Sequence, residues 1–168
     1  RDDSADTGEG GDVDTSNLDA VESWDDLDPT HLADGETHDY PQSPPVGGRH
    51  APIWLECGVY DDELPEENVV HDLEHGTVWI TYRPGTPPEA VADLAQALPD
   101  EGILSPHPEQ SAPVVVTVWA TQLELSGPED PRLDQFLRAY GNGETAPEPM
   151  ASCPGGVERF ESEDSVIA

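Results

Sequence analysis

Between residues 64 and 141 the chain alternates between segments with apolar residues at helical spacing and short apolar runs rich in β-branched residues. The first kind predicts helices and the second predicts strands. Helices are expected over 64–76, 87–98 and 130–141; strands are expected over 77–82 and 113–120, and 121–126 either continues the second strand or pairs with it. This order predicts a single small α+β domain, with a mixed sheet of three to four strands and two to three short helices.

The first of these helices carries signals for both of its ends. Pro65 suits the first turn, and the acidic side chains of Glu66 and Glu67 favour the positive end of the helix dipole. Gly76 is a ready C-terminal stop, because glycine adopts the left-handed conformation without strain. The helix is therefore expected to end just after His75.

The composition divides the chain into three regions. Residues 1–30 are rich in Asp, Gly and Ser and read as a long acidic N-terminal tail or linker, although Leu18, Val21 and Trp24 have the spacing of a short helix. The α+β domain is expected over 31–160, with a C-terminal tail over 161–168. Within the domain, residues 40–54 are rich in Pro and Gly and predict a loop.

The charge is extreme, with 37 acidic residues against 6 basic ones and a net charge of −31. Nucleic acid is therefore not an expected partner, since phosphate binding needs clustered basic side chains. No run of 18 apolar residues occurs, so direct membrane insertion of this chain is not expected either. The chain begins at Arg1 rather than methionine, which is expected if a leader was removed or if the sequence starts inside a gene.

The two cysteines, Cys57 and Cys153, lie far apart in the sequence. In a secreted chain such a pair reads as one disulfide; two separate thiols or metal ligation are the alternatives. The acidity and the absence of an initiator methionine favour an oxidising compartment. The predicted location is therefore secreted or at the cell surface.

The stretch HDLEHG, residues 71–76, is the strongest candidate for chemistry. His71 and His75 are four residues apart, so on a helix they share one face and can close on one metal ion. Glu74 is rotated by about 100° from His75, and we expect it to orient an imidazole rather than to act as a general base. The alternative is that both histidines serve packing alone.

A third metal ligand is available in His50, which ends the stiff loop sequence PPVGGRH. The alternative is a turn histidine that hydrogen-bonds to the backbone. His31, His38 and His107 are weaker candidates that we expect at the surface. An all-imidazole set suits copper or zinc, and the general order of affinities favours copper.

The leading hypothesis is therefore a non-enzymatic extracellular domain that binds copper or zinc through His50, His71 and His75. One alternative is a self-associating structural subunit of an extracellular filament or oligomer, held partly by its N-terminal tail. Another is a zinc-dependent hydrolase, since H-x-x-E-H is the inverted zinc-peptidase pattern. That enzyme needs a further glutamate from a second helix, and here Gly76 and a strand follow instead. No catalytic residue is therefore assigned.

Three blocks of the sequence together resemble the bacterial family called domain of unknown function 3105. They are YPQSPPVGGRHAPIWLECGVYD, ENVVHDLEHGTVWITYRP and the LSPHP and APVVVTVWA segments, within residues 31–153. The resemblance implies a secreted or membrane-anchored protein and a Cys57–Cys153 pair. It also singles out His50, His71, Glu74 and His75, and it adds His31 as a fourth candidate. The secondary candidates for metal ligands are therefore His31, Glu74 and His107.

Overall fold

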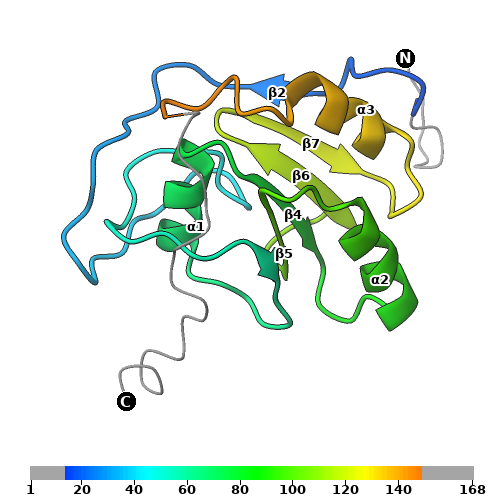
Figure 1. The fold of residues 1–168 in the computed structure, drawn as a ribbon, viewed down its shortest axis with the longest axis horizontal. Helices are drawn as coiled ribbons and strands as arrows, with labels where there is room; N and C mark the ends of the chain where they lie inside the picture. The colour runs from blue at the N-terminus through cyan, green and yellow to red at the C-terminus, as the bar shows by residue number, and fades with distance from the viewer. Residues whose placement is uncertain (1–13, 149–168) are drawn as a thin grey trace.

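A six-stranded mixed sheet forms the centre of residues 14–148, the part of the chain that the computed structural model describes (Figure 1). The strands are β2 (Glu22–Ser23), β3 (Gly58–Val59), β4 (Val78–Tyr82), β5 (Gly102–Pro106), β6 (Val114–Val118) and β7 (Thr121–Leu125). Their order across the sheet is β2-β7-β6-β4-β5-β3. β4 pairs in parallel with β5 and antiparallel with β6, so the two kinds of pairing meet at this central strand.

Three helices accompany the sheet: α1 (Glu66–Glu74), α2 (Pro88–Ala97) and α3 (Arg132–Tyr140). The α+β class and the predicted helices are therefore present, but the prediction of three to four strands was wrong. β5 lies in a stretch for which we expected neither a helix nor a strand, and it pairs in parallel on both sides, with β4 and β3. β2 and β3 have two residues each, which is too short to produce a periodic pattern.

The predicted Cys57–Cys153 disulfide involves a residue outside the described part of the chain. Cys57 is the one cysteine among residues 14–148 and is not a free thiol, and Cys153 lies outside the described residues. Among the same residues, no helix is both long enough and apolar enough to cross a membrane.

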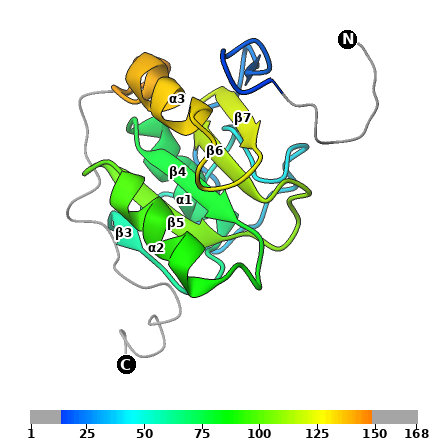
Figure 2. The same ribbon diagram turned by 90° about the vertical axis from the view of Figure 1, so that its right-hand side faces the viewer.

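The two faces of the sheet carry two separate apolar clusters, because side chains alternate along each strand. On one face, Val78 and Ile80 of β4 pack with Leu94 of α2 and Phe136 of α3. On the other face, Trp79 packs with α1. Figure 2 shows α2 and α3 in front of the sheet and α1 behind it. The α1 side is the side on which the histidines gather.

The described part of the N-terminal tail lies against its own sheet. The short helix predicted around Leu18, Val21 and Trp24 is not formed; instead β2 pairs antiparallel with β7. The Trp24 amide donates to the Ala120 carbonyl at 2.9 Å, and Leu27 packs on the α1-side cluster. Pairing with a strand a hundred residues away thus overrides the local helical pattern. Self-association into an oligomer or filament stays a prediction.

Candidate metal centre

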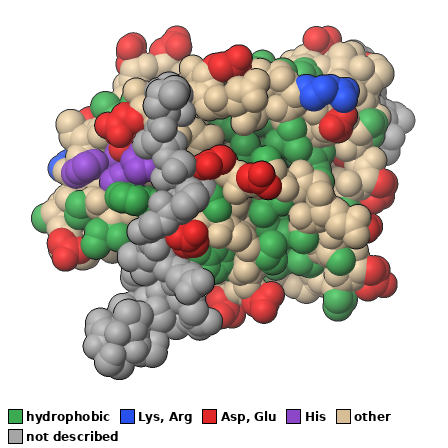
Figure 3. Space-filling model, in the orientation of Figure 1, with side chains coloured by type: hydrophobic (Ala, Val, Ile, Leu, Met, Phe, Trp, Pro, Cys, Tyr) green, Lys and Arg blue, Asp and Glu red, His purple; other side chains and the backbone are tan. Residues whose placement is uncertain are grey.

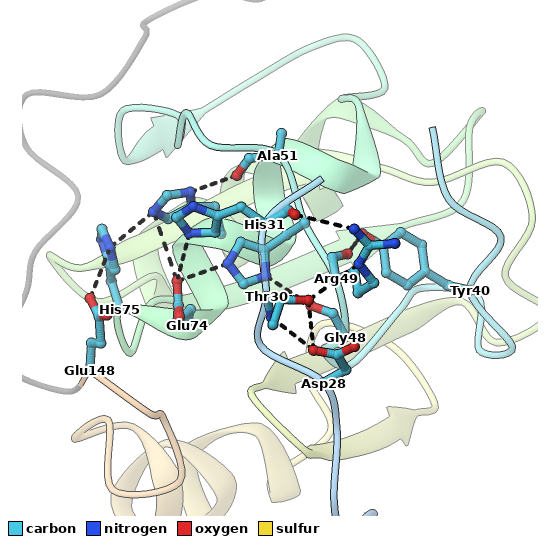
Figure 4. A network of polar contacts seen from close by, with 12 residues as sticks. Asp28, Thr30, His31, Tyr40, Gly48, Arg49, Ala51, Glu74, His75 and Glu148 are labelled. Carbon is cyan, nitrogen blue, oxygen red and sulfur yellow. Dashed lines mark hydrogen bonds and ion pairs between the residues drawn. The ribbon is translucent and has the colours of Figure 1, made fainter. Parts of the chain in front are cut away.

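Four side chains from three separate segments converge on the α1 side of the sheet. They are His31, His50, His71 and Glu74, whose ligand atoms all lie within 4.8 Å of one another. The Glu74 Oε1 is central: it lies 2.8 Å from His50 Nε2 and 3.9 Å from the Nε2 atoms of both His31 and His71 (Figure 4). Two atoms bound to one metal at about 2.1 Å can be up to roughly 4.2 Å apart. These distances therefore suit ligands of one ion.

The helix α1 supplies two of the four side chains, and its C-terminal end is fixed where the sequence predicted. The Gly76 amide donates to Leu73 and the Thr77 amide to Asp72, both across the helix end, and Gly76 has a φ of 99°. This is the Schellman arrangement that glycine permits. Because His71 and Glu74 are three residues apart, they occupy the same face of α1.

The loop that carries His50 is clamped onto α1 by hydrogen bonds from both sides. The Ala51 amide donates to the Glu67 carbonyl at 3.0 Å, and the Leu55 amide donates to the buried Asp72 carboxyl at 2.7 Å. Burial raises the pKa of Asp72 well above its usual range, against the lowering effect of the Leu55 hydrogen bond. These contacts leave His50 fully buried beside the helix.

His31 reaches the cluster through the backbone rather than through a motif. It forms an isolated parallel bridge with His50, in which the Leu32 amide donates to the His50 carbonyl at 2.7 Å. The Arg49 guanidinium strengthens the bridge by donating to the His31 carbonyl and to the Thr30 hydroxyl. The His31 and His50 ring centroids are consequently 4.9 Å apart.

Backbone carbonyls set the tautomers of the two buried histidines. His50 Nδ1 lies 2.8 Å from the Gly48 carbonyl, and His71 Nδ1 lies 2.7 Å from the Ala51 carbonyl. A carbonyl only accepts, so each Nδ1 carries the proton, and in the neutral ring each Nε2 carries a lone pair. Both Nε2 atoms face the Glu74 carboxylate, and His50 Nε2 is so close to it, at 2.8 Å, that a proton or a metal ion must lie between the two atoms. Carbonyl-held imidazoles of this kind are typical of metal-ligating histidine.

His71 stays neutral at physiological pH. Its burial lowers its pKa to about 4, although the Ala51 hydrogen bond opposes that shift and the neighbouring imidazoles add to it. Neutral imidazole is the form that binds metals. The centre thus combines a ligand-ready imidazole with a nearby carboxylate.

The cluster is open to solvent on one side. His31 has half of its side chain exposed, whereas the side chains of His50, His71 and Glu74 are at least nine-tenths buried. Histidine side chains reach the surface in Figure 3, beside acidic ones. An ion can therefore enter past His31 without unfolding of the domain.

The other candidates lie elsewhere. His75 is outside this group of four, although its Nε2 lies 3.2 Å from that of His71. His107 is buried in a pair with the Glu66 carboxylate, and His38 packs its ring on Tyr40. Within the described chain neither joins a potential metal group, and the surface position expected for His107 was wrong.

Glu74 and Glu148 are the residues whose placement the sequence did not indicate. Glu74 was only a secondary metal candidate, expected to orient an imidazole, but it lies at the centre of the group. The sequence signal for this position was the spacing of three residues between His71 and Glu74, which puts both side chains on one face of the helix. The rotation of Glu74 from His75 about the helix axis was not informative. Glu148 comes from the segment after α3, and its amide donates to the Glu74 carbonyl at 3.0 Å. No motif marks it.

Comparison with known protein families identifies the family of this chain. Residues 31–155 match the family described as Protein of unknown function (DUF3105), and this match covers more than half of the 168 residues. The chain belongs to this family. The match includes His31, His50, His71, Glu74, His75 and Glu148. No curated protein and no solved structure matches the chain.

Proposed function

We propose that this DUF3105 protein binds one transition metal ion through His31, His50, His71 and Glu74. The observation that carries the proposal is the direction of the lone pairs. Two buried imidazoles, each with its Nδ1 proton held by a backbone carbonyl, aim Nε2 at the same carboxylate oxygen. Three Lewis bases that face one another repel unless a proton or a metal ion lies among them, and a metal ion can serve all three at once.

The donor set favours a borderline metal. Three imidazole nitrogens and one carboxylate oxygen suit zinc or copper(II), and raw affinity places copper above zinc. Hard cations such as calcium prefer sets made of oxygen alone. We therefore propose copper as the bound metal, with zinc as the competitor.

The proposed role is metal binding rather than catalysis, at an extracellular location. The location is supported by the strong acidity of the chain. At a net charge of −31, the field around the molecule attracts cations and raises their concentration near the site.

Metal analysis of untagged protein tests this proposal. We expect copper or zinc to remain bound after dialysis against a weak chelator, and we expect metal-free protein to rebind copper(II) in a chelator-buffered titration. His50→Ala and His71→Ala should each remove this binding. His38→Ala is the matched control, because His38 lies outside the group and should leave binding unchanged.

The buffered titration is needed because 37 acidic residues give a weak background of bound cations. Tight binding that persists in His50→Ala would place the metal elsewhere. Absence of tight binding for both copper and zinc in the unaltered protein would refute the proposal.

A further inference from the structure

A second group of potential ligands lies directly beside the first. Glu74, His75 and Glu148 bring their ligand atoms within 4.8 Å of one another. Glu74 belongs to both groups, and the Nε2 atoms of His71 and His75 are 3.2 Å apart across the boundary (Figure 4). The two groups therefore adjoin but differ in membership.

His75 Nε2 lies between His71 and Glu148. The His71 Nδ1 proton is committed to the Ala51 carbonyl, so His71 Nε2 accepts a hydrogen bond from His75 Nε2 at 3.2 Å. On its other side, the same His75 nitrogen lies 3.8 Å from the Glu148 carboxylate. An ion in the inner group would take the His71 lone pair, and His75 Nε2, which then has no acceptor, would be free to bind a cation beside Glu148.

Hydrogen bonds within the described chain satisfy only one of the two ring nitrogens of His75. Its side chain is 7 % exposed, yet its Nδ1 has no hydrogen-bond partner among the described residues. Buried polar atoms are nearly always paired, and Nδ1 is the nitrogen that carries the ring proton when Nε2 binds a metal. The Trp54 ring packs at 5.1 Å from the His75 ring and at 5.4 Å from the His71 ring, which holds the two imidazoles side by side.

Glu148 completes the group from the solvent side. Its backbone is anchored to the Glu74 carbonyl, while 60 % of its side chain is exposed. The carboxylate can therefore rotate to meet an ion without disturbing the fold. This outer group consists of two carboxylates and one imidazole, so it is more anionic and more accessible than the inner one.

We propose that a second divalent transition metal ion binds between Glu74, His75 and Glu148, with the Glu74 carboxylate bridging the two ions. This inference rests on the proposed function of the inner site. A carboxylate has two oxygens, and bridged ions in two-metal sites lie about 3.5–4 Å apart. Glu74 belongs to both groups, so its two oxygens are the atoms placed to bridge the ions. The ligands are four imidazoles and two carboxylates, so they neutralise only part of the positive charge of two divalent ions. The strongly negative charge of the whole chain favours binding of such a positively charged centre.

Copper(II) titration with electron paramagnetic resonance tests the second ion. The unaltered protein should bind two equivalents tightly, and the bridged pair should couple, so the signal should integrate to well below two spins. Glu148→Gln should reduce tight binding to one equivalent with a full, uncoupled spin. Glu144→Gln is the matched control, because Glu144 is an exposed neighbour outside both groups. His75→Ala should have the same effect as Glu148→Gln. Because the Glu148 side chain is mostly exposed, Glu148→Gln should fold and so tests the inference even if His75→Ala does not fold.

The alternative outcomes separate this inference from the proposed function. One tight equivalent that is lost in His50→Ala and kept in Glu148→Gln overturns the second ion and leaves the inner site. If the protein binds one equivalent of copper and His75→Ala weakens that binding, His75 is a ligand of the inner ion. This result also overturns the second ion. Two equivalents that neither outer variant changes place the second ion elsewhere. No tight copper at all refutes both proposals.

Discussion

Glu74→Gln should change the metal-free and the metal-bound protein in opposite directions. Glutamine has nearly the same shape as glutamate, but it is neutral and carries amide protons. In the metal-free protein the new amide can donate to His50 Nε2, where the carboxylate oxygen now lies at 2.8 Å. A neutral hydrogen bond of this kind stabilises by about 0.5–1.5 kcal/mol. We therefore expect the metal-free variant to be more stable than the unaltered protein by about 1 kcal/mol.

The metal-bound state should lose much more. At a free metal concentration of about 100 times Kd, binding stabilises the unaltered protein by about 2.7 kcal/mol. Loss of the one anionic ligand should weaken binding by at least about 100-fold, which leaves about 0.4 kcal/mol at the same concentration. For a domain of this size 1 kcal/mol corresponds to roughly 3–4 °C. The metal-induced rise in Tm should fall from about 9 °C to about 1–2 °C.

Thermal unfolding followed by circular dichroism, in chelator-buffered copper(II), measures both effects in one experiment. The two melting curves should exchange order between metal-free and metal-bound conditions. If Glu74→Gln destabilises the metal-free protein by more than 1 kcal/mol, Glu74 is the partner of a protonated His50, and the lone-pair argument fails. If the variant keeps the full metal-induced shift, Glu74 is not a ligand.

Three further predictions concern the scaffold. Gly47→Ala should destabilise the protein by about 1–3 kcal/mol and weaken copper binding, because Gly47 has a φ of 153° and an added Cβ would lie 2.7 Å from Leu27; an unchanged Tm would contradict this. Asp130 is buried, which raises its pKa, but hydrogen bonds from the Arg132 guanidinium and from backbone amides outweigh this and lower the pKa to about 2. Since this pKa lies below the unfolded value of 3.8, the stabilisation is complete above about pH 4 and is lost as the pH falls toward 2. Asp130→Asn should cost about 1–2 kcal/mol at pH 7 after screening by solvent, and should flatten the pH dependence of unfolding in this window; an unchanged slope would exclude Asp130 as its source. Raising NaCl from about 0.01 M to 1 M should raise Tm, since the screening length shrinks from about 30 Å to about 3 Å and the net charge of −31 repels itself less; a fall in Tm would show that favourable ion pairs dominate.

Local signals predicted the elements that depend on neighbouring residues. The end of α1 follows from Gly76, whose backbone conformation is a property of one residue, and the structure confirms it. The same holds for the three helices and for the long central strands, whose apolar patterns span enough residues to be recognised. The spacing of His71 and His75 likewise follows from helix geometry, and their Nε2 atoms do meet.

The composition of the metal centre depended on contacts between distant segments. His31 joins His50 through a backbone bridge, and Glu148 joins Glu74 through another backbone hydrogen bond. The sequence around His31 and around Glu148 contains no signal for these contacts, because the contacts form when whole segments pack against α1. β5 was missed for the same reason, since its hydrogen-bond partners lie on other strands.

The sequence alone thus determined the helix that carries HDLEHG, its end at Gly76 and the expectation of a histidine site. The tertiary structure decided which atoms face one another. In the folded chain Glu74 lies at the centre of the candidate site, His31 belongs to the group, and His75 lies beside it. The physical reason is that helix ends and hydrophobic periodicity are short-range properties of the chain. A metal centre, in contrast, is defined by lone-pair directions that only the packed fold and its backbone carbonyls can fix.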